Sequence, residues 1–391
     1  SSSFKIMKLN FGEEWKELKR FEKLPSELRK IVFYSENEFY TIHFEKLMRE
    51  LTDVHKQTIC YVTSSKTDPL LNSNNEKILS FFIGDGIART DFFINLKADI
   101  LLMTMPDLQT FHIKRSKVYP VHYVYIFHSI VSTHMIYRKK AFDNFDTIFC
   151  VGKHHFNEIV TNEKKYELPS KNLIEYGYEK LDQLINENEK RRQETVAHSK
   201  KTILVASSWD DNGLIETKGM EIIQILLDNN YNVILRPHPV TLKKSQNVIK
   251  NIQKKFQKNT NFDLDVDIRN LDSFFTSDCM ISDWSGVAIE YAFALKKPVL
   301  YVDIQKKINN SDYRELNIIP IEEKIRAEIG TIISPNELAI LPKFIEDLCS
   351  KTNQNEKNIL DIRKETVFNL GTSEKIGAQV LLGLLKKKYE K

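Results

Sequence analysis

The sequence lacks the features that would place it outside the ordinary globular proteins. No run of about 18 apolar residues occurs, so no transmembrane helix is predicted. The first residues, SSSFKIMKLNFGEEWKELKR, lack the apolar core of a signal peptide. The net charge of +4 is too small to indicate nucleic-acid binding, and we expect no nucleic-acid partner.

Cysteine is also scarce, with 4 among 391 residues. Cys60, Cys150 and Cys279 lie within apolar runs, and no CxxC pair occurs. Scattered, buried thiols are typical of a reducing compartment, and the missing CxxC pairs remove the commonest zinc motif. We therefore expect a cytoplasmic protein with no metal and no cofactor. Peripheral contact with the inner face of the plasma membrane is left open.

Several catalytic signatures are missing as well. The sequence has no HExxH, GxSxG, P-loop or protein-kinase motif. This argues against the metalloproteases, the α/β-hydrolases, the P-loop nucleotide hydrolases and the kinases.

Apolar runs alternate with helical patterns along most of the chain. The runs are continuous, as expected for parallel strands buried on both faces. They lie at residues 31–35, 58–63, 78–83, 99–104, 122–127, 147–151, 202–207, 232–236, 278–282 and 298–302. Helical patterns lie at 39–51, 217–228 and 287–295. This alternation predicts the α/β class with parallel sheets.

A polar, charged stretch, LINENEKRRQETVAHSKK, divides the chain. We predict a Rossmann-like acceptor domain at 1–195 and a Rossmann-like nucleotide-donor domain at 196–372. The C-terminal helix at 373–391 is predicted to return to the first domain. Ligands of such sheets bind at the carboxyl ends of strands, so functional residues should follow strands directly.

The stretch ISDWSGVAIEYAFAL changes from strand to helix through Ser282, Asp283, Ser285 and Gly286. A helix N-terminus attracts anions, hydroxyls donate hydrogen bonds, and glycine lets a ligand approach. The stretch therefore fits a phosphate cradle, although serine or aspartate that merely caps the helix would look the same. Glu290, one turn further, could reach a ribose hydroxyl or simply face solvent.

The stretch VILRPHPV places Arg236 and His238 on a loop stiffened by two prolines, directly after a strand. An arginine fork matches phosphate oxygens, and histidine can donate to phosphate or move a proton. The alternative is a structural turn with a surface histidine.

In the first half, His128 follows the run YVYIF, where it could act as a general base on an acceptor hydroxyl. The alternative is a hydrogen-bonded core histidine. Ser129 and His134 are further acceptor-side candidates, His134 being more typical of a packing residue. Asp85, in a Gly-Asp-Gly turn, is another, although a tight turn alone would explain the glycines.

The remaining signals are less specific. Ser207 and Ser208 follow the first strand of the second half and could line the donor site. FDLDVDIRN, at 262–270, looks like a DxD metal motif, but its period of two favours an exposed strand edge. EEWKELKRFEKL, at 13–24, is amphipathic and fits either a membrane surface or a helix packed on its domain.

The motifs FHS, LRPHP and SDWSG…EYAFALKKPVLYVD, in this order over residues 120–303, resemble the CDP-glycerol glycerophosphotransferase family of teichoic-acid primases and polymerases. The resemblance implies a GT-B fold, with two Rossmann-like domains facing across a cleft. It also implies transfer of glycerol phosphate from CDP-glycerol to a hydroxyl of a lipid-linked or polysaccharide acceptor. The products would be CMP and a longer cell-surface polymer.

The same resemblance implies roles for particular residues. His128 would be the base, Arg236 and His238 would meet the donor phosphates, and Ser282, Asp283 and Ser285 would form the nucleotide-phosphate loop. Thr372 and Ser373, at the start of the last helix, would approach the donor.

The chain departs from the family pattern at four positions. Phe127 and Ser129 replace tryptophan and glycine beside the histidine, and Trp284 and Gly286 replace tyrosine and serine. The alternative is therefore a GT-B glycosyltransferase that uses a CMP- or UDP-sugar in capsule or lipopolysaccharide assembly, with attack at carbon rather than phosphorus. A non-catalytic nucleotide-binding protein is a third hypothesis, against which the histidines in both halves argue.

Overall fold

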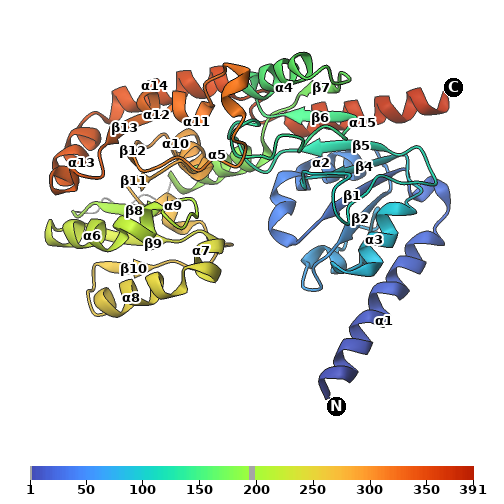
Figure 1. The fold of residues 1–391 in the computed structure, drawn as a ribbon, viewed down its shortest axis with the longest axis horizontal. Helices are drawn as coiled ribbons and strands as arrows, with labels where there is room; N and C mark the ends of the chain where they lie inside the picture. Colours follow the sequence, from blue (N-terminus) through green and yellow to red (C-terminus); the bar gives the residue numbers. More distant parts are fainter. Residues whose placement is uncertain (1, 193–198) are drawn as a thin grey trace. The chain divides into compact units, whose positions relative to one another are not determined.

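The computed structural model describes residues 2–192 and 199–391. The chain forms two compact units (Figure 1). Unit 1 contains residues 1–128, 138–180 and 367–391, and unit 2 contains residues 129–137 and 181–366. The predicted boundary at 195/196 lies outside the described residues, so the domain assignment stays a prediction.

Unit 1 is built on a 7-stranded sheet with the order β3-β2-β1-β4-β5-β6-β7, and all neighbouring strands are parallel. This is the doubly wound order, in which the strand order reverses between β1 and β4. The strands are β1 (Ile31–Ser35), β2 (Ile59–Thr63), β3 (Ile78–Phe82), β4 (Ile100–Met103), β5 (His122–Ile126), β6 (Thr147–Cys150) and β7 (Asn172–Glu175).

Most helices of unit 1 lie between successive strands of the sheet, whereas α1 precedes β1 and α15 follows all seven strands in the chain. They are α1 (Ser2–Glu22), η1 (Ser26–Leu28), η2 (Glu38–His43), α2 (Glu45–Arg49), η3 (Glu50–Val54), η4 (Pro69–Asn72), α3 (Ile87–Ile94), α4 (Lys153–Lys165) and α15 (Ser373–Tyr389). The helix predicted at 39–51 is divided among η2, α2 and η3, because Glu38–His43 form a 3-10 helix and Glu50–Val54 form a π-helical segment.

Unit 2 has a 6-stranded parallel sheet with the order β10-β9-β8-β11-β12-β13. Its strands are β8 (Thr202–Ala206), β9 (Asn232–Arg236), β10 (Phe262–Leu264), β11 (Cys279–Ser282), β12 (Val299–Val302) and β13 (Gly330–Ile333). Strand β10 is an edge strand but spans only Phe262–Leu264, so the strand-edge interpretation of FDLDVDIRN holds for FDL, and DVDIRN forms the loop that follows.

The helices of unit 2 follow the same alternation, with α6 and α8 lying beside β9 and β10 (Figure 1). They are α5 (Glu179–Arg192), α6 (Leu214–Asp228), α7 (Pro239–Lys244), α8 (Gln246–Phe256), α9 (Asp272–Thr276), α10 (Gly286–Leu295), η5 (Tyr313–Leu316), α11 (Ile321–Lys324), α12 (Arg326–Ile329), η6 (Leu338–Ile340), α13 (Leu341–Ser350) and α14 (Thr352–Thr366). The prediction of an α/β fold with two Rossmann-like sheets is confirmed.

Each unit has its own apolar core. In unit 1, Leu47 of α2 and Ala378 and Leu381 of α15 pack in one cluster with buried side chains of the sheet. In unit 2, side chains of α6, α8 and α13 form a cluster with β8, β9 and β11. Burying a side chain of leucine size contributes about 1.5–3 kcal/mol. These clusters therefore hold the helices on their sheets.

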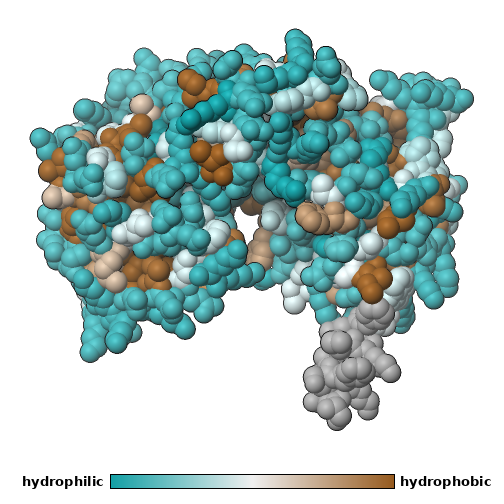
Figure 2. Space-filling model, in the orientation of Figure 1, coloured by the Kyte–Doolittle hydropathy of each residue, from teal (hydrophilic) through white to brown (hydrophobic). Residues whose placement is uncertain are grey.

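The second half of α1 is packed rather than free. Leu18 and Phe21 are buried, and the Phe21 ring contacts the rings of Phe81 and Phe92 at 5.4 and 5.3 Å. This part of the apolar face is thus covered by β3 and α3. No helix in the described part of the chain is long and apolar enough to cross a membrane. On the face shown in Figure 2, apolar residues form scattered patches on a mostly hydrophilic surface.

Glu179, a residue of unit 1, binds the start of α2 through a buried carboxylate. Its oxygens accept hydrogen bonds from the backbone N–H groups of Lys46 (3.0 Å) and Leu47 (2.9 Å), at the start of α2. The Tyr176 hydroxyl donates a third, at 3.1 Å. Burial nevertheless raises the pKa of Glu179 to about 8. The folded state therefore binds a proton that the unfolded state releases between about pH 4.5 and 8.

This pKa predicts that stability falls as the pH rises through that window, by a few kcal/mol, and levels off above pH 8. We expect Glu179→Gln to lose this pH dependence, because glutamine does not ionise. Urea unfolding at pH 5, 7 and 8.5 measures it, with the exposed Glu175→Gln as control. A variant whose unfolding free energy depends on pH as in the unmodified chain would contradict the assignment.

Candidate active site

His128 lies in unit 1 directly after β5, where the sequence predicts a base. Its Nδ1 lies 3.1 Å from the carbonyl oxygen of Thr104. A carbonyl only accepts hydrogen bonds, so Nδ1 carries the proton and Nε2 of the neutral ring carries the lone pair. The Tyr178 hydroxyl donates to the His128 backbone oxygen at 3.2 Å and restrains the main chain. The arrangement holds a basic nitrogen at a fixed position.

Two aromatic neighbours of His128 are not predicted by the sequence. His43 is buried, 6.3 Å from the His128 ring, and it stacks on Tyr178 at 5.6 Å. Burial, followed by the charges of Lys180 and His128, holds the pKa of His43 well below its usual value. His43 is therefore neutral near pH 7. Tyr178 follows the carboxyl end of β7 closely, a signal that could have identified it, whereas His43 is the last residue of η2, beyond the end of β1.

The other candidates of unit 1 lie in different surroundings. Asp85 is exposed after β3 and, through its charge, helps to raise the pKa of Glu14 on α1. Thr372 is exposed and donates weakly to the Asn369 carbonyl, whereas Ser373 is buried at the start of α15. The donor-binding role of Thr372 and Ser373 stays a prediction.

Directly after His128 the chain enters unit 2, where residues 129–137 are held by polar contacts. The Ser132 N–H and hydroxyl both donate to the buried Glu322 carboxylate, at 2.9 and 2.7 Å. His134 Nε2 donates to the Ile318 carbonyl at 2.9 Å. His134 thus has an anchoring contact in unit 2, as its packing interpretation anticipates.

Gly286, the first residue of α10, is in close contact with this segment. A Cβ there would lie 2.8 Å from Ser129 Oγ and 3.1 Å from Val131 Cγ1. Close packing thus explains why position 286 is a glycine, and the sequence does not reveal this reason.

We expect Gly286→Ala to destabilise the protein by about 1–3 kcal/mol. Adding Ser129→Gly should recover part of this loss in thermal unfolding, and an additive second loss would contradict the packing explanation.

The β11–α10 loop, residues 283–285, is fixed by Asp283. Its Oδ1 accepts from the N–H groups of Ser208 (3.0 Å) and Ser285 (3.2 Å), and its Oδ2 accepts from the Ser208 hydroxyl at 3.1 Å. Burial raises the pKa of Asp283 to about 6. Ser285 Oγ accepts from Val287 N–H at 3.3 Å and caps α10. The carboxylate organises the loop, and Ser285 is a helix cap in this structure.

Two hydroxyls lie at the same edge of the sheet, at the ends of the neighbouring strands β8 and β11. Ser207, after β8, and Ser282, at the end of β11, are buried, and neither Oγ has a hydrogen-bond partner among the described residues. Buried hydroxyls normally have partners, so a ligand oxygen would satisfy them. Glu290 is buried in α10 rather than solvated. Its contact with a ribose stays a prediction.

Trp284, a departure from the family pattern, is held by a buried arginine. The Arg326 guanidinium lies 3.8 Å from the Trp284 ring centre and pairs with Asp303 at 3.1 Å. The indole N–H donates to the Ile304 carbonyl at 3.0 Å. These contacts fix the β11–α10 loop, and no sequence signal near Arg326 identifies them.

His238 is held in one tautomer. Its Nδ1 accepts from Val240 N–H at 3.0 Å and caps α7, so Nε2 of the neutral ring bears the proton. Burial, followed by the charge of Lys307, lowers the pKa of His238 to about 4. His238 is therefore a neutral hydrogen-bond donor near pH 7.

Arg236 is engaged with protein groups. Its guanidinium pairs with Asp265 at 2.6 Å and donates to backbone carbonyls of the following loop. Its implied contact with the donor phosphates stays a prediction.

Comparison with known proteins adds a family assignment to this geometry. The sequence profile of the CDP-glycerol:poly(glycerophosphate) glycerophosphotransferases matches residues 19–318. The chain belongs to this family. The resemblance based on the motifs is confirmed, and the protein is a transferase that acts on CDP-glycerol. Among curated proteins, a sequence search finds no match.

Several solved structures share the fold of this chain. A variant of the wall teichoic acid polymerase TagF, soaked with CDPG, is 16% identical with a TM-score of 0.60, and the match covers 99% of this chain and 97% of the chain in that structure. UDP-GlcNAc 2-epimerase from Neisseria meningitidis bound to UDP-GlcNAc is 16% identical (TM-score 0.53; 92% and 100% covered). Sucrose-phosphate synthase from Thermosynechococcus elongatus is 12% identical (TM-score 0.51; 92% and 99% covered). At these identities the likeness shows the fold, and the predicted GT-B fold is confirmed.

Lys307 of this glycerophosphotransferase is a cation that none of the sequence motifs includes. Lys307 follows β12 at the carboxyl edge of the unit 2 sheet, and its Nζ donates to the Trp209 carbonyl at 2.9 Å. It is close enough to depress the pKa of His238. Two adjacent lysines in the segment that follows β12, Lys306 and Lys307, are the signal that could have identified it.

No group of three or more His, Cys, Asp or Glu could hold a metal within residues 2–192 and 199–391. A reaction that needs no metal stays a prediction.

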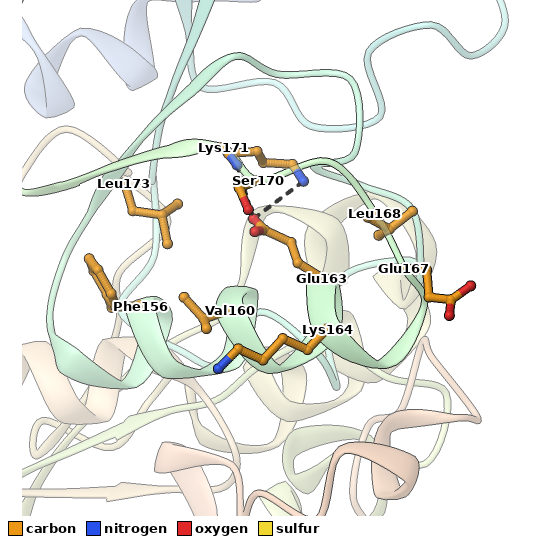
Figure 3. A pocket seen from close by; sticks show the side chains of 9 residues that line it. All are labelled: Phe156, Val160, Glu163, Lys164, Glu167, Leu168, Ser170, Lys171 and Leu173. Carbon is orange, nitrogen blue, oxygen red and sulfur yellow. Dashed lines mark hydrogen bonds and ion pairs between the residues drawn. The ribbon is translucent and has the colours of Figure 1, made fainter.

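A surface pocket of about 390 Å³ lies in unit 1 between α4 and the chain leading to β7 (Figure 3). Its wall includes a nearly buried ion pair, Lys171 Nζ to Glu163 Oε1, at 3.6 Å. None of the predicted site residues lines this pocket.

Proposed function

We propose that this transferase lengthens a poly(glycerol phosphate) chain in teichoic acid synthesis. It would move glycerol phosphate from CDP-glycerol to a terminal hydroxyl of the acceptor. The observation that carries this proposal is the family match over residues 19–318, which spans both motif-bearing halves. The acceptor would be lipid-linked and presented at the inner face of the plasma membrane. The four cysteines are free thiols, as in a reducing compartment.

In the proposed reaction, the acceptor oxygen attacks the β-phosphorus of CDP-glycerol. The bond between this phosphorus and the bridging oxygen breaks, and CMP leaves with that oxygen. The glycerol phosphate becomes joined to the acceptor by a new phosphodiester. His128 Nε2, whose lone pair follows from the contact of Nδ1 with Thr104, takes the proton of the attacking hydroxyl.

On the donor side, groups of unit 2 would stabilise the charge on the phosphates. The His238 Nε2–H, the hydroxyls of Ser207 and Ser282, and the start of α10 all lie at the carboxyl edge of one parallel sheet. The partial positive charge of a helix N-terminus and the ammonium of Lys307 favour anions there. Fixed donors and cations of this kind supply the largest stabilisation in phosphoryl transfer.

A donor panel tests this function. The chain is incubated with CDP-glycerol, CDP-ribitol, a CMP-sugar and a UDP-sugar, each with a lipid-linked and a water-soluble hydroxyl acceptor. We expect CMP release from CDP-glycerol at least about 100-fold faster than nucleotide release from the sugar donors, and a preference for the lipid-linked acceptor. Turnover of a sugar nucleotide with CDP-glycerol inert would contradict the proposal and favour a glycosyltransferase.

A further inference from the structure

The guanidinium of Arg236 donates hydrogen bonds to several acceptors in one loop, residues 265–270. Nη1 donates to Asp265 Oδ2 at 2.6 Å and to the carbonyl oxygens of Asn270 (2.7 Å) and Asp267 (3.2 Å). Nη2 donates to the Ile268 carbonyl at 3.1 Å. The side chains of Arg236 and Asp265 are only 13% and 16% exposed. A guanidinium with four acceptors in one loop holds that loop in place, and we call this set of contacts the clamp. A phosphate could bind the guanidinium only by displacing some of these acceptors.

The clamped loop, residues 265–270, joins β10 to α9 and is called the β10–α9 loop below. Strand β10 runs parallel to β9, and Asp265 N–H donates to the Leu235 carbonyl at 2.8 Å. The loop therefore leaves the sheet at the same edge as His238 and the β11–α10 loop. This is the edge at which parallel sheets of this order bind nucleotides.

Two exposed apolar side chains of this loop suit the face of a nucleobase. Val266 and Ile268 are 50% and 37% exposed, and their apolar surfaces can pack on the face of a base. The Asp267 carboxylate and the loop carbonyls that do not accept from Arg236 are acceptors, which match the exocyclic amino group of cytosine. The lysines at this edge, Lys306 and Lys307, belong instead to the segment after β12.

We propose that Arg236 is a positioning residue for the donor base. It holds the β10–α9 loop in the shape that receives the cytosine of CDP-glycerol, and it does not contact the donor phosphates. This inference rests on the proposed function for the identity of the base. It assigns Arg236 a role different from the phosphate contact that the motif implies.

The test is a double-mutant cycle measured by titration calorimetry on the full chain, with CMP and inorganic pyrophosphate as separate probes. We expect Arg236→Gln and Asp265→Asn each to weaken CMP binding by about 10–30-fold. The double variant should have about the same affinity for CMP as the single variant that binds CMP less tightly, because both changes break the same clamp. Pyrophosphate affinity should stay within about twofold throughout.

Two further variants separate this role from a loss of folding. Ile268→Ala changes a partly exposed side chain, so the thermal midpoint should not move while CMP binding weakens by about 3–10-fold. Arg191→Gln breaks an exposed arginine–aspartate pair of the same unit (2.6 Å) and is the matched control, expected to bind CMP normally.

Two results would contradict the inference about Arg236 and its loop, and a third would contradict the proposed donor. If Arg236→Gln weakens pyrophosphate as much as CMP while Asp265→Asn binds both normally, Arg236 contacts the phosphates and the inference is overturned. Unchanged CMP binding by Ile268→Ala would contradict the contact between loop and base. A preference of the unmodified chain for UMP over CMP would contradict the proposed donor instead, and the same cycle with UMP would still test the clamp.

Discussion

Replacing His128 with asparagine is expected to lower the turnover number by about two to four orders of magnitude, with little change in donor affinity. The reason is the tautomer that the Thr104 carbonyl imposes. With Nδ1 protonated, Nε2 is the nitrogen that can take a proton from the acceptor hydroxyl. Asparagine can keep a hydrogen bond to Thr104, but it cannot accept that proton near neutral pH.

Steady-state kinetics with varied CDP-glycerol measure this effect, and CMP titration measures donor affinity. His112→Asn is the matched control, because His112 is exposed on a loop of the same unit. Turnover of His128→Asn within a few-fold of the unmodified enzyme would show that the base is another group, and the neighbouring His43 would be the next to test.

The second large effect is expected at His238. Its Nε2–H is fixed as a donor because Nδ1 caps α7, and removing one such donor to a developing oxyanion costs about 100- to 1,000-fold in turnover. His238→Ala removes both the donor and the cap. His238→Asn keeps the cap through its side-chain oxygen and offers an amide N–H, so we expect it to recover part of the activity.

The pKa of His238, about 4, adds a pH test. Since the folded state disfavours the charged ring, the stability linked to this group is fully present above about pH 6.5 and is lost as the pH falls toward 4. Since His238 stays neutral between pH 6 and 8, any inflection of the turnover number in this range should persist in His238→Asn. An inflection that disappears in His238→Asn would contradict the role of a neutral donor. Equal activity of the alanine and asparagine variants would contradict it as well.

The buried strands of the fold could be predicted from sequence, and the edge strands only partly. Strands such as β1, β4 and β11 are buried along their whole length, and their continuous apolar runs identify them. Strands β7 and β13 lie at the ends of their sheets and are partly exposed, so NLIE and GTII carry no such run. Partial solvation at an edge removes the signal on which the prediction depends.

The positions of the candidate site residues followed from strand ends, but their partners did not. His128 and His238 each follow a strand as expected, whereas the carbonyl of Thr104 and the loop carbonyls around Arg236 are contacts between distant segments. Asp283 illustrates the same limit, because its hydrogen bonds to Ser208 join the ends of two neighbouring strands. A motif reports residue types, whereas the partner that occupies a side chain is set by tertiary structure.

The most direct measurement of the central claim is the identity of the nucleotide released from CDP-glycerol, followed by ³¹P NMR during turnover. Attack at the β-phosphorus predicts CMP and one new phosphodiester signal in equal amounts, both abolished by His128→Asn. Release of CDP would mean that the acceptor attacks carbon and the phosphate stays with the nucleotide. That result would contradict the account of this protein as a glycerophosphotransferase.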